Sequence, residues 1–191
     1  MVVTVAEAKT YTADEYLALE VESETRSEYR NGAILPMTGG TPIHNQITGN
    51  LIFLLKAALR RQPYSIFVKD QRLWIPERNI YTYPDVMVIP RPIALQPGRK
   101  DTVINPILIV EVLSDSTENY DRGDKFAAYR TIKTLQEYLL IDQSQHHVEQ
   151  YARQNANQWL FTEYDGEEAR VALASIPVEI ALVDLYEDVE F

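Results

Sequence analysis

The sequence predicts a mixed α/β (α+β) fold in a single domain over residues 1–191, with a mixed central sheet flanked by helices. The chain of 191 residues has no internal repeat and no Gly/Ser-rich linker, and this length suits one medium-sized domain. Helical and strand-like patterns follow one another in an irregular order, unlike a strictly alternating α/β protein. The run Ile107–Leu113 is apolar at odd and even positions apart from Glu111, which is typical of a central strand covered on both faces.

The amino-terminal part of the chain carries helix and hairpin signals. A capping box that begins at Thr12 opens a short helix through Glu20. The pair Asn31-Gly32 is a strong signal for the turn of a β-hairpin. From Ile43 to Arg61 apolar residues recur at helical spacing, and Pro63 blocks continuation of the helix. We therefore expect a helix, a hairpin and then the longest helix of the chain.

The rest of the chain is dominated by short runs of β-branched and aromatic residues. Four of them indicate strands of one sheet: Tyr64–Val68, Arg72–Ile75, Val86–Ile89 and Ile107–Leu113. A helix is then predicted over Asp121–Ile132. Three additional carboxyl-terminal strands are expected at Tyr138–Ile141, Val148–Ala152 and Trp159–Tyr164.

The composition limits the kinds of site and partner. The chain has no cysteine, which excludes disulfides, thiolate zinc sites and a cysteine nucleophile, and suits a cytoplasmic location. No apolar run approaches the length needed to span a bilayer, and the amino terminus lacks a signal-peptide pattern. We therefore expect a cytoplasmic protein with no membrane partner.

The net charge of −10 at first argues against a nucleic-acid partner, because phosphate binding relies on Lys and Arg. The acidic excess lies at the two ends, since residues 1–30 carry seven acids against three bases and residues 161–191 carry nine against one. Between Lys56 and Lys100, nine basic residues stand against three acids. This basic segment is compatible with a nucleic-acid partner, although a solvated surface with scattered ion pairs explains it equally well.

Two carboxylates stand next to or within apolar strands. Glu111 lies inside the run Ile107–Leu113, where a lone charge would cost several kcal/mol, so it must be paired, hydrogen-bonded, protonated or bound to a cation. Asp85 directly precedes the second apolar run, Val86–Ile89. Two carboxylates on neighbouring strands can share a hard divalent cation, Mg²⁺ or Mn²⁺. Asp85 could instead be a turn former after proline, and Glu111 could pair with an arginine.

Lys125 is the candidate basic partner of this acid pair. In metal-dependent phosphodiester hydrolysis, a nearby lysine orients or activates the attacking water. Lys125 lies on the helix that follows the strand of Glu111, close enough to fold back toward it. By itself it would more often be a surface residue paired with Asp121 one turn earlier. Tyr129, one turn later, would orient Lys125 or simply pack, and His44 would contact a phosphate or cap its helix.

Several segments together resemble the Uma-type restriction endonucleases of the PD-(D/E)XK superfamily. They are Arg26-Ser-Glu-Tyr-Arg-Asn-Gly32, Tyr83-Pro-Asp-Val-Met-Val88, the stretch from Asn105 to Thr117, Asp121-Arg-Gly-Asp-Lys-Phe-Ala-Ala-Tyr129 and Gln136-Glu-Tyr-Leu-Leu-Ile-Asp142. The resemblance extends from the helix at Thr12 to Tyr186. It implies a restriction endonuclease-like core, metal-dependent chemistry on DNA and a homodimer.

The resemblance also assigns roles to individual residues. Asp85 and Glu111 match the metal-binding acids, and Glu28 matches an acidic position of the amino-terminal hairpin that completes the metal site. The superfamily pattern places a lysine two residues after the second acid, where this chain has Leu113. The resemblance implies that the lysine has migrated to the following helix as Lys125.

Three functions follow as hypotheses. The first is an endonuclease dependent on Mg²⁺ or Mn²⁺ that cuts double-stranded DNA with Asp85, Glu111, Glu28 and Lys125. The second is a catalytically degenerate module of the same fold that binds metal or nucleic acid without turnover, which the acidic charge and Leu113 favour. The third is a hydrolase of a small phosphorylated molecule, which would need no extended basic surface.

Overall fold

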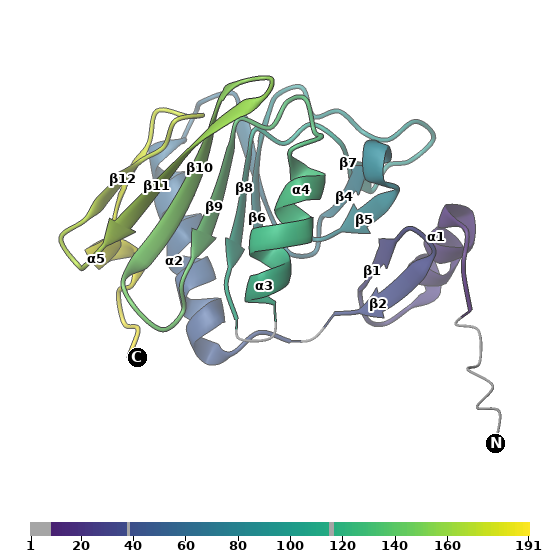
Figure 1. Cartoon of the computed structure of the whole chain (residues 1–191), viewed down its shortest axis with the longest axis horizontal. Coiled ribbons are helices and arrows are strands. Elements are labelled where there is room, and N and C mark those ends of the chain that lie inside the picture. The colour runs from purple at the N-terminus through teal and green to yellow at the C-terminus, as the bar shows by residue number, and fades with distance from the viewer. Residues whose placement is uncertain (1–8, 38, 115–116) are drawn as a thin grey trace.

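Two mixed sheets organise the chain in a computed structural model that describes residues 9–37, 39–114 and 117–191. The larger sheet has six strands, ordered β11-β10-β9-β8-β6-β3, and runs from the left toward the middle of Figure 1. These strands are β3 (Tyr64–Val68), β6 (Val86–Pro90), β8 (Leu108–Val112), β9 (Glu137–Ile141), β10 (His147–Asn155) and β11 (Gln158–Asp165). All neighbours are antiparallel except β8 and β9, which are parallel. The predicted mixed α/β fold class is therefore confirmed.

A five-stranded sheet lies beside the amino-terminal helix, with the order β2-β1-β5-β4-β7. Its strands are β1 (Ser27–Arg30), β2 (Ala33–Pro36), β4 (Arg72–Ile75), β5 (Ile80–Thr82) and β7 (Thr102–Val103). The prediction of one sheet for all four middle strands was wrong for Arg72–Ile75. The turn at residues 76–79, with Asn79 in the left-handed region at φ 51°, lets β4 pair with β5 rather than with β3.

The hairpin expected at Asn31-Gly32 joins β1 to β2. Asn31 has φ 45° and Gly32 has φ 105°, as the positive dihedrals of a tight hairpin turn require. A side chain at Gly32 would also meet the Thr10 methyl group, 2.5 Å from where a Cβ would stand. The turn therefore needs glycine for both its backbone conformation and its packing, and it fixes β1, the strand that carries Glu28.

The helices depart from their predicted bounds mainly after β8. Helix α1 (Ala13–Glu22) has the predicted Thr12 capping box, and α2 (Pro42–Ala58) is capped by Thr41. The helix predicted over Asp121–Ile132 starts earlier, at α3 (Glu118–Tyr120), passes through a π-helical turn (Asp121–Lys125) and ends with α4 (Phe126–Tyr129). It stops short because Thr131 and Ile132 bond back only three residues, in tight turns.

The larger sheet is covered on both faces, which explains its apolar strands. On one face, α2 packs with the carboxyl-terminal elements β12 (Arg170–Ala172), β13 (Glu179–Ala181) and α5 (Leu182–Leu185). On the other face, α4 packs over Met87 and Ile109. Glu111 has the same strand parity as Ile109, so its side chain points to the α4 face. No helix within the described ranges has the length and apolar character to cross a membrane.

Candidate active site

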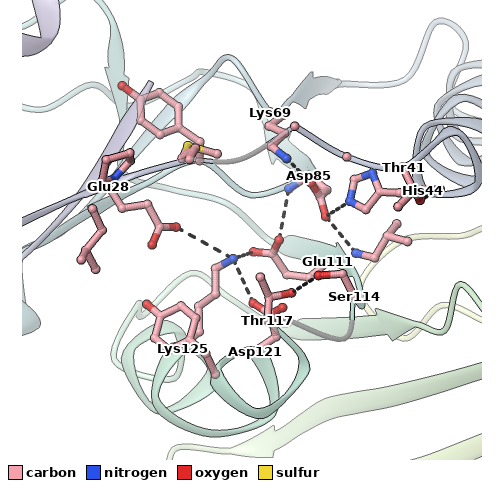
Figure 2. Close-up of a pocket in the computed structure, with 18 of the residues that line it drawn as sticks. Glu28, Thr41, His44, Lys69, Asp85, Glu111, Ser114, Thr117, Asp121 and Lys125 are labelled. Carbon is pink, nitrogen blue, oxygen red and sulfur yellow. Dashed lines mark hydrogen bonds and ion pairs between the residues drawn. The ribbon is translucent and has the colours of Figure 1, made fainter. Parts of the chain in front are cut away.

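The pairing of β6 with β8 brings Asp85 and Glu111 together. Val86 is the antiparallel partner of Val110, so Asp85 lies beside Glu111 at the end of the pair. The Asp85 backbone N–H donates to Glu111 Oε2 over 3.3 Å, and the Val112 N–H donates to Asp85 Oδ2 over 2.9 Å. Each strand therefore positions the carboxylate of the other. The two acids that the sequence singled out do lie side by side (Figure 2).

Glu111 is buried, and its Oε1 makes the shorter contacts. Its Oε1 accepts from the Tyr129 hydroxyl at 2.7 Å and lies 2.8 Å from Lys125 Nζ. Burial raises the pKa of Glu111 to about 8, although the Lys125 ammonium opposes this shift; Asp85 and Asp121 add like-charge repulsion. The site therefore holds more negative charge than one ammonium balances.

His44, in the N-terminal turn of α2, contacts one oxygen of Asp85. His44 Nε2 lies 3.1 Å from Asp85 Oδ2, the oxygen that also accepts from Val112. Burial opposes ionisation, but the His44 contact and the charge of Lys125 hold the pKa of Asp85 below its ordinary value. Asp85 Oδ1 has a single contact within the described parts of the chain, Lys69 Nζ at 3.8 Å. One oxygen of Asp85 thus stays weakly engaged.

Lys125 lies on the π-helical turn and reaches three acids. Its Nζ is 2.8 Å from Glu111 Oε1, 3.1 Å from Asp121 Oδ1 and 4.0 Å from Glu28 Oε1, as the dashed lines of Figure 2 show. Burial opposes its charge, but these carboxylates raise the pKa of Lys125 well above its ordinary value. The i−4 pairing with Asp121 considered from the sequence is present, whereas a surface position for Lys125 is wrong.

Glu28 approaches the site from β1, on the far side of the Lys125 ammonium. Thr82 donates to Glu28 Oε1 over 2.5 Å, and the Arg30 guanidinium bonds to Oε2. Burial opposes ionisation, yet Lys125 and Thr82 hold the pKa of Glu28 below its ordinary value. Its connection to the other acids runs through Lys125. A role for Glu28 as a third metal ligand stays a prediction.

The acids and Lys125 line a cavity of about 240 Å³. The sequence predicted only some of its lining residues. Its wall also includes Lys69, Arg30, Tyr120 and the segment 39–41. The Arg30 guanidinium lies 3.5 Å over the Tyr120 ring. These residues were missed because they come from loops and strand ends whose pairing the sequence does not reveal. For Asp121, the one indication in the sequence was its place in the segment Asp121-Arg-Gly-Asp-Lys, which carries part of the family resemblance.

The donor atoms fit a hard divalent cation held by two carboxylates. Asp85 Oδ1 and Glu111 Oε2 are the less engaged oxygens of the pair, since their partner oxygens carry the short contacts to His44, Val112, Tyr129 and Lys125. Within the described ranges, no group of three or more His, Asp or Glu side chains is placed to hold one ion. Two carboxylates would be enough for Mg²⁺ or Mn²⁺, which use few protein carboxylates and take their other oxygens from water and phosphate.

Two secondary expectations are refined by the geometry. The Tyr129 hydroxyl, considered from the sequence as a group that orients Lys125 or simply packs, donates to Glu111 Oε1, the same oxygen that Lys125 Nζ approaches. Leu113, at the position of the usual superfamily lysine, is 3% exposed and packs in the core on the α4 face. Lys125 reaches Glu111 from the helix that covers this same face.

Comparisons with known proteins agree with the fold. A family model described as "Uma2: Putative restriction endonuclease" matches residues 13–183. Two proteins of Synechocystis sp. (strain ATCC 27184 / PCC 6803 / Kazusa) are similar over nearly their whole lengths. The first, "Uncharacterized protein sll1609", is 44% identical over 91% of this chain and 98% of its own length. The second, "Uncharacterized protein slr1290", is 34% identical over 93% of this chain and 92% of its own length.

A solved structure shows the same fold. It is the crystal structure of "a putative nuclease belonging to DUF820" from Anabaena variabilis ATCC 29413, with a TM-score of 0.75 and 22% sequence identity over 92% of this chain and 97% of that chain. The family match covers most of the chain, including Glu28, Asp85, Glu111 and Lys125. The chain therefore belongs to the Uma2 family of restriction endonuclease-like proteins.

Proposed function

We propose that the chain is a DNA endonuclease, dependent on Mg²⁺ or Mn²⁺, with Asp85, Glu111 and Lys125 at its active site. The observation that carries the proposal is the contact of a buried lysine with the second of two adjacent carboxylates, 2.8 Å from Nζ to Glu111 Oε1, at the wall of an open cavity. Membership of the Uma2 family and the nuclease name of the Anabaena protein support the same reading.

Asp85 and Glu111 would hold the cation. When bound, such an ion lowers the pKa of a coordinated water and neutralises charge that develops on the phosphate. The protein contributes fixed carboxylates: His44 and the Val112 N–H hold Asp85, and the Tyr129 hydroxyl holds Glu111. Such supporting contacts fix ligand orientation before substrate arrives. Glu28 completes the acidic wall and shares in positioning Lys125.

Lys125 would act as a protonated donor. Because its pKa is raised well above the ordinary value by Glu111, Asp121 and Glu28, its ammonium keeps its proton at neutral pH. We therefore assign it to orienting the attacking water and stabilising charge on the phosphate, rather than to taking up a proton. Lys125 would thus supply, from the helix, the positive charge that other superfamily members have at the position of Leu113.

The rival within the same fold is a module that binds metal or nucleic acid without cleavage. The tight enclosure of Lys125 by three carboxylates favours it, because an ammonium held in this way has few free donors. A hydrolase of a small phosphorylated molecule is the third reading. The size of the cavity, about 240 Å³, would admit such a substrate.

The direct test is incubation of the purified chain with supercoiled, linear double-stranded and single-stranded DNA, in Mg²⁺, in Mn²⁺ and in chelator. We expect nicking or linearisation of double-stranded DNA with either cation and none in chelator. Metal-dependent DNA binding without cleavage in all arms would instead support the degenerate module. Neither DNA binding nor cleavage, together with turnover of small phosphate esters that DNA does not inhibit, would support the third reading.

Cation binding is expected to release protons at neutral pH. With its pKa at about 8, Glu111 is largely protonated at pH 7 before the cation arrives, and a carboxylate must be ionised to act as a ligand. The apparent affinity for Mn²⁺ should therefore rise with pH up to about 8 and level off above it. Calorimetric titrations in two buffers of different ionisation enthalpy measure this release.

A control variant tests whether the protons released on cation binding come from Glu111. Glu149, another buried glutamate, lies on β10 away from the cavity and pairs with Arg122. The Glu149→Gln variant should release as many protons as the wild type. Binding of Mn²⁺ with no buffer dependence between pH 6 and 8 would contradict a role for protonated Glu111 as a ligand.

A further inference from the structure

Three lysine and arginine side chains are among the described residues that line the cavity: Arg30, Lys69 and Lys125. Two of them are held by hydrogen-bonded carboxylates. Arg30 bonds to Glu28 and stacks on Tyr120, and Lys125 lies 2.8 Å from Glu111. Lys69 differs, because its one ion pair in the described structure is the 3.8 Å contact with Asp85, longer than a hydrogen bond.

Strand register explains why Lys69 lies at the site. Val68, the last residue of β3, is the antiparallel partner of Val86, the first residue of β6. The next residue on each strand is therefore Lys69 on one side and Asp85 on the other. The Lys69 side chain enters the cavity from the side of Asp85, and Lys125 enters from the side of Glu111 (Figure 2).

The Lys69 side chain is also open to solvent. It is 39% exposed, against 10% for Lys125. The neighbouring acid does not neutralise it, because Asp70 pairs with Arg26 at 2.8 Å. A flexible ammonium that is weakly paired loses little when it turns to a new anion. Lys125, buried among three acids, would lose far more.

We propose that Lys69 binds a phosphate oxygen of the DNA backbone beside the acid pair and so positions the strand to be cut. This role rests on the proposed function and adds a residue to it. A compact ammonium binds phosphate as a point charge, and such a contact fixes the register of the backbone without reading sequence. Lys69 also adds a positive charge to a cavity wall that contains Glu28, Asp85, Glu111 and Asp121.

The test is DNA binding measured without turnover, by fluorescence anisotropy of a labelled duplex in chelator over a series of salt concentrations. The Lys69→Gln variant should bind roughly three- to ten-fold more weakly at moderate salt, and its salt slope should be smaller by about one, because one phosphate contact is lost. Lys69→Arg should bind like the wild type. The matched control is Lys133→Gln, at an exposed lysine outside the cavity wall, which should leave affinity and slope unchanged.

Cleavage kinetics in Mg²⁺ give an independent readout. Lys69→Gln should raise KM and change kcat by no more than about three-fold, as expected when a contact made equally in ground and transition states is lost. Wild-type affinity and salt slope in Lys69→Gln would overturn the role of Lys69 while leaving the nuclease proposal standing. A wild-type chain that neither binds nor cleaves duplex DNA, in chelator or in Mg²⁺, would overturn both.

Discussion

Glu111→Gln is expected to reduce DNA cleavage about 10³-fold or more while leaving the fold intact. The substitution removes one of two carboxylates that would hold the cation, and loss of several kcal/mol of metal-derived stabilisation corresponds to this factor in rate. The glutamine carbonyl can still accept the hydrogen bond that the Tyr129 hydroxyl makes to Oε1. At pH 7 the substitution changes the charge of the metal-free site little, because Glu111, with its pKa raised to about 8, is already largely protonated there. Single-turnover cleavage of supercoiled DNA in Mg²⁺, with thermal unfolding in parallel, measures both effects.

Asp85→Asn should have the same effect on cleavage. The asparagine oxygen can replace Asp85 Oδ2 as the acceptor from the Val112 N–H, so the strand ends stay joined. The Glu149→Gln control changes a similarly buried glutamate that does not line the cavity and should cleave like the wild type. Cleavage within ten-fold of the wild type in both Glu111→Gln and Asp85→Asn would show that the acid pair is not the catalytic metal site.

Local sequence signals were sufficient for most single elements of the fold. The strand bounds Tyr64–Val68 and Arg72–Ile75 agree with β3 and β4, because turn-forming residues flank these short β-branched and aromatic runs. The hairpin at Asn31-Gly32 was equally local, since the turn itself demands positive dihedrals. Which strands pair was not predictable in this way. The pairing of β1 with β5 places Tyr29 opposite Tyr81, and no short window of sequence contains both residues.

Within the site, the residues that could be predicted from the sequence were those whose burial is energetically costly without a partner. Glu111 could be singled out because a carboxylate inside an apolar strand needs a partner, and the structure gives it Lys125 and Tyr129. Lys69 left no such trace, because its place beside Asp85 follows only from the register of β3 and β6. The same limit applied to the π-helical turn Asp121–Lys125, which sequence periodicity shows as ordinary helix.

Lys125→Met is expected to lower both stability and cleavage. The ammonium lies within 4.0 Å of Glu111, Asp121 and Glu28, all of them buried. Removing one partner of a buried ionic cluster leaves uncompensated charge and typically costs about 3–5 kcal/mol. Cleavage should fall about 10²- to 10⁴-fold, the usual contribution of a positioned proton-transfer or donor group. Chemical unfolding and single-turnover cleavage at the same pH measure the two losses.

A double variant separates the structural role of Lys125 from the catalytic one. In Lys125→Met with Asp121→Asn, one unpaired carboxylate is removed, so part of the lost stability should return because less charge is buried without a partner. Cleavage should stay low, since no ammonium then faces Glu111 to orient water. If cleavage instead recovers in step with stability, Lys125 only neutralises the acids, and catalysis would have to rest on the acid pair and its cation. The ratio of recovered rate to recovered free energy of unfolding thus decides whether this buried lysine takes part in the chemistry or only supports the site.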